Sequence, residues 1–256
     1  MATFNAKKSL GQNFLMHARI AERIADSACL APDAVVLEIG PGTGMLTRAL
    51  LQRAAKVIAV EADYELFERL QSDFAHEIAE GRLELVHSDI RNYPLNTAIA
   101  GNYGYQVVAN IPYYLTGEIF RLFLESENQP SSITLLVQKE VAERVARSKK
   151  ESILSLSVKA YGTPKYEFTV KRGAFKPAPK VDSAVLTIRD ISRKNFASSK
   201  EEELFFRIIH AGFAHKRKFV RKNLLCIPGM HNNTMDIPEK ARAEDLPLSV
   251  WLALCR

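Results

Sequence analysis

Short apolar runs alternate with segments of helical periodicity over about the first 190 residues of the chain. The runs that we interpret as strands cover residues 35–39, 57–60, 83–86, 107–109 and 133–137. Between them, apolar residues recur three or four positions apart, as at Phe67, Leu70 and Phe74, and this spacing indicates helices with one apolar face. Because strands and helices alternate, the pattern predicts an α/β fold with a parallel sheet that helices cover on both faces.

The pattern changes in the following stretch of the chain. Two further apolar runs, at 166–170 and 184–188, flank a proline-rich segment with the sequence Phe-Lys-Pro-Ala-Pro at 175–179. We interpret these runs as two strands that are joined by a stiff loop and added at the end of the same sheet.

A polar stretch at 190–200 then has the composition of a linker. Beyond it, one helical face is predicted by the spacing of Leu204, Phe205, Ile208, Ile209 and Phe213. The remaining residues show short helical patterns and no convincing strand. We therefore expect two domains, an α/β domain at 1–190 and a small all-helical domain at 191–256.

The composition excludes several classes of protein. The chain is 47% apolar and 25% charged, which is typical of a folded domain and excludes a mostly disordered chain. No stretch approaches the roughly 20 apolar residues that a membrane span needs, and residues 1–11 lack the apolar core of a secretory signal. Cys29, Cys226 and Cys255 are too far apart in the sequence to suggest a disulfide framework, so we expect a cytoplasmic protein with reduced thiols.

The net charge of +6 is distributed unevenly. Residues 1–190 carry a net charge of +1, whereas residues 191–256 carry +5. Many ordinary domains have a similar imbalance, but a near-neutral body with a basic tail is also typical of proteins that bind a polyanion such as nucleic acid.

The first predicted strand leads into a turn with glycines at 40, 42 and 44. Glycine tolerates positive φ and lets a ligand approach the backbone, and the amides at the start of the following helix point into the turn. The second strand ends in Glu61, which lies 21 residues after Gly40. An acidic residue at that spacing suits the two ribose hydroxyls of an adenosine cofactor.

The spacing of the glycines bears on the class of cofactor. Dinucleotide sites favour Gly-x-Gly-x-x-Gly, whereas this loop is Gly-x-Gly-x-Gly and follows Glu38, the pattern of S-adenosylmethionine (SAM) methyltransferases. The third strand ends near Asp89, whose carboxylate can accept a hydrogen bond from an adenine amino group. The loop has no basic residue before Arg48 to pair with phosphate, which favours SAM, although a turn that binds no ligand remains an alternative.

The sequence Asn-Ile-Pro-Tyr at 110–113 follows the fourth predicted strand directly. Ligands of doubly wound sheets bind beyond the carboxyl ends of such strands. The Asn110 amide oxygen and the Ile111 carbonyl can both accept hydrogen bonds from an exocyclic amine, and Tyr113 offers a flat surface on which a purine can stack. No metal or strong base is required, because the methyl donor is already a cation and positioning does most of the work.

The chain resembles the ribosomal RNA adenine dimethyltransferases of the KsgA type over nearly its whole length. The stretches that carry the resemblance are 8–15, 38–47, 110–113, 138–145, 177–183 and 242–244. None of them is unique to the family, but together and in this order they are highly specific. The resemblance implies a Rossmann-like SAM-dependent methyltransferase sheet and transfer of four methyl groups to N6 of two adjacent adenosines. These adenosines lie in the 3′-terminal hairpin of small-subunit (16S) ribosomal RNA.

The resemblance also implies roles for individual residues. Those implied to bind the cofactor are Asn13, Leu15, Gly40, Glu61, Asp89 and Asn110. Asn110 would sit between cofactor and target, and Phe175 would sandwich the flipped adenine against Tyr113. With RNA as substrate, we interpret five basic residues as phosphate contacts: Lys216, Arg217, Lys218, Arg221 and Lys222. A solvated helix end is the alternative for this basic stretch. We expect a monomer without a metal that acts in ribosome biogenesis.

Three other functions compete with this interpretation. An enzyme of the macrolide-resistance type would methylate a large-subunit adenosine with the same pocket, but Asp182 and the Arg-Ala-Glu at 242–244 favour the KsgA type. An assembly factor without catalysis would not need the intact glycine loop and the Asn-Ile-Pro-Tyr sequence. A nicotinamide dehydrogenase does not fit the spacing of the glycines. Residues 114–118, in the loop beyond the pocket, differ from the usual family pattern.

Overall fold

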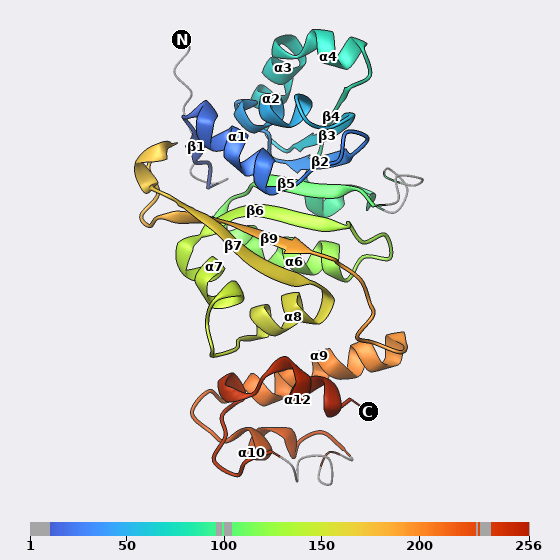
Figure 1. Ribbon diagram of the computed structural model, residues 1–256, viewed down its shortest axis with the longest axis vertical. Helices are drawn as coiled ribbons and strands as arrows, with labels where there is room; N and C mark the ends of the chain where they lie inside the picture. The colour runs from blue at the N-terminus through green and yellow to red at the C-terminus, as the bar shows by residue number, and fades with distance from the viewer. Residues whose placement is uncertain (1–10, 96–98, 100–103, 229, 231–236, 256) are drawn as a thin grey trace. The chain divides into compact units, whose positions relative to one another are not determined.

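The computed structural model describes residues 11–95, 99, 104–228, 230 and 237–255 (Figure 1). Residues 8–10 of the first family-like stretch lie outside the described residues. The chain divides into two compact units, one made of 1–142 and 165–191 and the other of 143–164 and 192–256.

A seven-stranded sheet forms the centre of the first unit, with the strand order β4-β3-β2-β5-β6-β9-β7. The strands are β2 (Val35–Ile39), β3 (Lys56–Glu61), β4 (Leu83–His87), β5 (Gln106–Asn110), β6 (Ser132–Gln138), β7 (Thr163–Val170) and β9 (Ser183–Arg189). Strands β2 to β6 pair in parallel, and β9 runs antiparallel to β6. This arrangement confirms the predicted α/β class and the two late strands that extend the sheet.

The sequences of the central strands explain their position. The five strands between the two edge strands, β3, β2, β5, β6 and β9, consist mainly of Val, Ile, Leu and Ala. On β6, six successive side chains from Ser132 to Val137 are buried. A strand buried on both faces carries mainly apolar residues at successive positions rather than at every second one. The order of the strands reverses between β2 and β5, so the carboxyl ends of these two strands open a crevice at the switch point, where such sheets bind their ligands.

Helices cover the sheet on both faces, and Figure 1 shows α1 (Ala18–Ser27) and α6 (Thr116–Leu124) on opposite sides. Further elements of this part of the chain are α2 (Met45–Leu51), α3 (Tyr64–Asp73), α4 (Ala75–Ala79), η2 (Ile90–Asn92), η3 (Tyr113–Leu115), α7 (Lys139–Ala146) and η4 (Arg172–Ala174). The apolar faces of α1 and α2 bury Ile24 and Leu50 against Val36 of the sheet. Asp63 caps α3 by accepting a hydrogen bond from the Glu65 amide, which fixes where the chain leaves β3.

A second, two-stranded sheet lies outside the predicted pattern. It pairs β1 (Phe14–Leu15) with β8 (Phe175–Lys176) in antiparallel register, so the first part of the proline-rich segment is strand rather than loop. The pairing ties the N-terminal segment to a part of the chain that is remote in sequence. Two-residue strands carry no periodic signal, and for this reason the sequence pattern did not reveal them.

The second unit consists mainly of helices: α8 (Ile153–Tyr161), α9 (Ser199–Phe213), α10 (Val220–Leu224), η5 (Ala243–Asp245) and α12 (Leu248–Ala253). Trp251 is fully buried, and its ring stacks on Phe213 at a centroid distance of 5.7 Å. Gly212 permits this packing, because a Cβ there would lie 2.4 Å from the Trp251 ring. The helical character of the C-terminal part matches the prediction.

The extent of the second unit differs from the expected domain at 191–256. Residues 143–164 belong to it as well, because α8 packs against the helices that follow the linker. The Tyr161 ring lies 5.6 Å from Phe196 and 6.1 Å from Phe206, and the Tyr161 carbonyl accepts a hydrogen bond from the Ser192 amide. The helix α8 was not identified from the sequence, so its place in the second unit was not predicted.

Candidate active site

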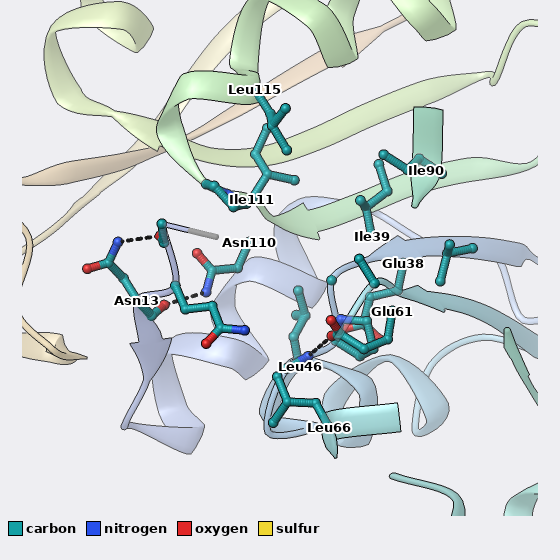
Figure 2. A pocket seen from close by; sticks show the side chains of 18 of the residues that line it. Asn13, Glu38, Ile39, Leu46, Glu61, Leu66, Ile90, Asn110, Ile111 and Leu115 are labelled. Carbon is teal, nitrogen blue, oxygen red and sulfur yellow. Dashed lines mark hydrogen bonds between the residues drawn. The ribbon is translucent and has the colours of Figure 1, made fainter. Parts of the chain in front are cut away.

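A pocket opens beyond the carboxyl ends of β2, β3 and β5 (Figure 2). The sequence-predicted residues that line it are Asn13, Leu15, Gly40, Glu61, Asp89, Asn110 and Tyr113. They come from separate parts of the sequence, and the topology brings them together because the ends of adjacent parallel strands share one edge of the sheet. In Figure 2, Asn13 and Asn110 lie on one side of the pocket and Glu38 and Glu61 on the other.

The glycine loop between β2 and α2 has the backbone conformation that the sequence predicts. Gly40 has a φ of +64°, and a Cβ placed on it would meet no atom within 4 Å, so its open face is accessible to a ligand. Gly44 has a φ of +75°, but a Cβ there would lie 2.5 Å from the Phe74 ring. The first glycine therefore admits a ligand, whereas the third permits close packing of the chain on Phe74.

Glu61 ends β3 with a carboxylate that is only 5% exposed. Its Oε2 accepts a hydrogen bond from the Gly42 amide at 3.0 Å, and its Oε1 accepts one from the Asp63 amide at 2.9 Å. Burial raises the pKa of Glu61, and the two amides oppose that shift. A carboxylate has about four lone-pair sites, so each oxygen keeps the capacity to accept a hydrogen bond from a ligand hydroxyl.

Glu38 on β2 also lines the pocket, with an exposed fraction of 1%. Within the described residues, its Oε2 has no hydrogen-bond partner. Burial raises the pKa of Glu38 to about 8, and the nearby Glu61 carboxylate contributes to the increase. A buried polar atom without a protein partner at a pocket wall is the expected signature of a site for a polar ligand.

Asp89 lies at the start of η2 and is bound by Arg91. Its Oδ1 accepts hydrogen bonds from the Arg91 amide and from Arg91 Nε, both at 2.9 Å, and its Oδ2 accepts one from Arg91 Nη2 at 2.6 Å. The hydrogen bonds from the Arg91 side chain hold the pKa of Asp89 below its usual range. The carboxylate therefore keeps one acceptor site, on Oδ2, in a fixed orientation. The hydrogen bonding of Arg91 to Asp89 was not predicted. A basic residue two positions after an aspartate could have indicated this ion pair.

The N-terminal segment positions Asn110. The side chain of Asn110, the last residue of β5, donates a hydrogen bond from Nδ2 to the main-chain oxygen of Asn13 at 3.2 Å. The side chain of Asn13 is itself directed by a hydrogen bond from its Nδ2 to the Gly11 carbonyl at 3.0 Å. Because Nδ2 of Asn110 is engaged, Oδ1 is the atom left to accept a hydrogen bond in the pocket. The sequence indicated Asn13 as a cofactor contact but not as the partner of Asn110.

Phe175 is the one predicted site residue that the structure does not bring to the pocket. Its side chain is 5% exposed and belongs to the apolar core with Leu15 and Val185. Successive side chains of a strand point to opposite sides, so in β8 Phe175 turns inward and Lys176 is exposed. Of the two aromatic residues expected to sandwich the adenine, Tyr113 lines the pocket and Phe175 does not.

The basic stretch at 216–222 connects α9 to α10 and continues into α10. Lys216, Arg217, Lys218 and Lys222 are exposed, as expected of phosphate contacts. Arg221 differs, because it is only partly exposed and its Nε donates a hydrogen bond to the Ile237 carbonyl. The structure thus gives Arg221 a role in holding the second unit together.

No helix among the described residues is long and apolar enough to cross a bilayer. The described part of the chain also contains no group of three or more His, Cys, Asp or Glu side chains arranged to hold a metal ion.

The doubly wound sheet with one reversed strand, the open glycine loop and the carboxylate at the end of β3 define a Rossmann-like methyltransferase. Comparison with known proteins narrows this class. Residues 3–255 match the family described as ribosomal RNA adenine dimethylase, and the chain belongs to that family.

The most informative relatives are similar over nearly their whole length. The chain is 38% identical to a ribosomal RNA small subunit methyltransferase A of Dehalococcoides mccartyi, over 99% of this chain and 88% of the relative. It is 36% identical to the protein of the same name from Fusobacterium nucleatum, over 99% and 97%. Among solved structures, the 23S rRNA methyltransferase ErmE has a TM-score of 0.77 at 26% identity, over 95% and 98% of the two chains. A dimethyladenosine transferase from Plasmodium falciparum has the same fold, with a TM-score of 0.77 at 23% identity over 94% and 95%.

Proposed function

We propose that this protein transfers methyl groups from SAM to N6 of two adjacent adenosines in the 3′-terminal hairpin of small-subunit (16S) ribosomal RNA. The observation that carries the proposal is the composition of one pocket. It combines acceptors suited to an adenosine cofactor, Glu61 and Asp89, with acceptors suited to an adenine amine at the end of β5. The relatives named small subunit methyltransferase A support the choice of the small subunit over the large one.

The residues present fit SAM. When bound, SAM supplies a methyl group that is activated by a positively charged sulfur. Glu61 uses its free lone pairs to accept hydrogen bonds from the ribose hydroxyls, and Asp89 Oδ2 accepts one from the adenine amino group. Glu38, the buried carboxyl without a described partner, is available to a polar group of the cofactor. Asn13 and Leu15 close the pocket on the side of the N-terminal segment.

The target side of the pocket orients an amine. Asn110 Oδ1 and the Ile111 carbonyl accept hydrogen bonds from the N6 amino group, which holds the nitrogen lone pair toward the methyl donor. The Tyr113 ring provides a surface for the base, which must leave its stack to enter a pocket. The chain contributes mainly by positioning, which supplies a large part of the rate when both reactants are bound.

The assignment of substrate is tested with two kinds of ribosomal subunit. Small and large subunits that lack their dimethyladenosines are incubated separately with methyl-labelled SAM, and the labelled base is then mapped. We expect label on the two adjacent adenosines of the small subunit. Label confined to the large subunit would instead assign the enzyme to the macrolide-resistance type, and no label on either would favour an assembly factor without catalysis.

The exposed basic residues of the second unit are proposed to bind RNA phosphates. Changing Lys216, Arg217 and Lys218 to Ala should weaken binding to small subunits and reduce the slope of log affinity against log salt by a little under about 1 for each lost contact. The modified base and the SAM affinity should not change, because the pocket residues belong to the other unit. Subunit binding is titrated at several salt concentrations.

A matched variant controls for the loss of charge alone. Lys194 and Lys200 are also exposed lysines of the second unit, and changing both to Ala should leave the salt slope close to that of the unaltered protein. If the triple variant keeps full affinity and an unchanged slope, the basic stretch serves solubility only. The monomeric state, the cytoplasmic location and the role in ribosome biogenesis stay predictions from the sequence.

A further inference from the structure

The hydroxyl of Tyr113 has a partner that the reaction scheme does not use. It lies 2.6 Å from the hydroxyl of Ser183, the first residue of β9. Because β9 is antiparallel to β6, the first residue of β9 lies at the edge of the sheet where the parallel strands end. There Ser183 pairs with Gln138, the last residue of β6. The contact therefore joins the loop after β5 to a strand that is two places away in the sheet.

Ser183 is held firmly in place by its surroundings. Its exposed fraction is 0%, and the preceding residue, Asp182, is bound from two directions. The Asp182 carbonyl accepts a hydrogen bond from the Lys139 amide at 3.0 Å, and its carboxylate accepts one from the Arg172 amide at 3.0 Å. Lys171 Nζ also lies 3.0 Å from this carboxylate. A hydroxyl on such an anchored segment is a fixed point for a side chain that lines the pocket.

Tyr113 needs such a fixed point. It belongs to the short helix η3, and its side chain is only partly buried, so packing alone does not hold the ring on every side. A tyrosine side chain turns about two bonds. Its hydroxyl oxygen lies on the axis of the second bond, so a hydrogen bond there restricts rotation about the first and fixes where the ring lies in the pocket. Without the serine, the Tyr113 hydroxyl has to bind water or another partner, and the position of the ring changes with it.

We propose that Ser183 is a positioning residue for methyl transfer: it fixes the position of the Tyr113 ring and thereby the placement of the adenine that stacks on it. The inference rests on the proposed function, in which Tyr113 carries the target base. The role proposed for Ser183 predicts different effects on the first and the second methyl transfer to the same adenine. Adenine offers two N–H groups to Asn110 and Ile111, but N6-methyladenine offers only one, so its orientation depends more on stacking. Loss of Ser183 should therefore impair the second transfer more than the first.

The test is a double-mutant cycle between Ser183→Ala and Tyr113→Phe. A neutral hydrogen bond of ordinary strength corresponds to a change of about 5-fold, so each single variant should lower the rate of the second transfer about 5-fold. The double variant should lose about 5-fold as well, rather than about 25-fold, because both changes remove the same contact. In all three variants N6-monomethyladenosine should accumulate, and the SAM affinity measured by calorimetry should not change.

Ser132→Ala is a matched control. Ser132 also begins a strand of the sheet, is 7% exposed and binds a side chain, Gln106, at 2.7 Å, but it does not line the pocket. It should lose stability without any accumulation of monomethyladenosine. If Ser183→Ala behaves like Ser132→Ala, or if the two changes of the cycle are additive, Ser183 is structural and the inference is wrong.

Tyr113→Ala separates this outcome from failure of the proposed function. The ring is removed entirely in that variant, so both transfers should slow by at least about 10-fold if the base stacks there. An unchanged rate would show that Tyr113 does not carry the target base. If Tyr113→Ala slows methyl transfer but Ser183→Ala and Tyr113→Phe keep the rates of the unaltered protein, only the role of Ser183 is wrong and the proposed function stands.

Discussion

Replacing Asn110 with alanine is expected to lower the turnover of methyl transfer by about 100-fold or more. The change removes Oδ1, the acceptor that we propose orients the target amine, and removal of one preorganised group of this kind typically costs about 10²–10³ in rate. It also removes the hydrogen bond to the Asn13 carbonyl, which releases the N-terminal segment from β5. RNA affinity should decrease only modestly, because we propose that the basic residues of the second unit, outside the pocket, bind the RNA phosphates. Single-turnover rates with small subunits and saturating SAM measure the effect.

Gln106→Ala provides the control for this experiment. Gln106 lies at the opposite end of the same strand, and its amide donates hydrogen bonds to the Ala28 carbonyl and to Ser132. Its loss should reduce the free energy of unfolding without affecting turnover at temperatures where the protein stays folded. Near-normal turnover in Asn110→Ala, with folding confirmed by circular dichroism, would eliminate Asn110 as the residue that orients the amine.

The positions predicted best from the sequence are those where local chemistry determines the structure. Glycine is the residue that adopts positive φ most readily, so Gly40 and Gly44 predicted that conformation. Both residues have it in the structure. Glu61 ends β3 as predicted, and Asn110, predicted to follow its strand directly, is the last residue of β5. Parallel strands bring their carboxyl ends to one edge of the sheet. Periodicity and turn chemistry together were sufficient to locate the pocket.

The remainder depended on contacts between residues that are remote in sequence. Phe175 resembles an exposed aromatic of a proline-rich loop, but pairing of β8 with β1 turns it into the core. The Asn13 carbonyl and Ser183 each hold a pocket residue through a hydrogen bond that spans about 70 to 97 positions. No local pattern encodes such a pair, because either partner alone is an ordinary strand end or loop residue.

The glycine loop and the end of β3 are coupled through Glu61, and this coupling has a consequence for the cofactor. Glu61 binds the Gly42 amide, so the carboxylate that we assign to the ribose also fixes the loop that faces the ligand. Because the loop is already ordered, a ligand that fits it loses little binding free energy to ordering the loop. The same arrangement makes Glu61 sensitive to substitution in two ways, through its own acceptor oxygens and through the position of Gly42.

Glu61→Ala is therefore expected to weaken SAM binding about 10- to 100-fold. Two ribose hydroxyls lose a charged acceptor, and hydrogen bonds to a charged group contribute about 1.5–3 kcal/mol. The Gly42 and Asp63 amides also lose their partner, so the free energy of unfolding should decrease at the same time. Calorimetric titration with SAM measures the first effect, and thermal unfolding without SAM measures the second.

A control for the loss of a carboxylate is Glu84→Ala on the neighbouring strand. Glu84 pairs with Lys56 at 2.6 Å on the surface and does not line the pocket, so SAM affinity should stay at the level of the unaltered protein. RNA affinity should be unaffected in both variants, since Glu61 lies in the cofactor part of the pocket. If Glu61→Ala bound SAM as well as the unaltered protein, or if the unaltered protein bound NAD more tightly than SAM, the carboxylate at the end of β3 would not be the ribose acceptor of a SAM site.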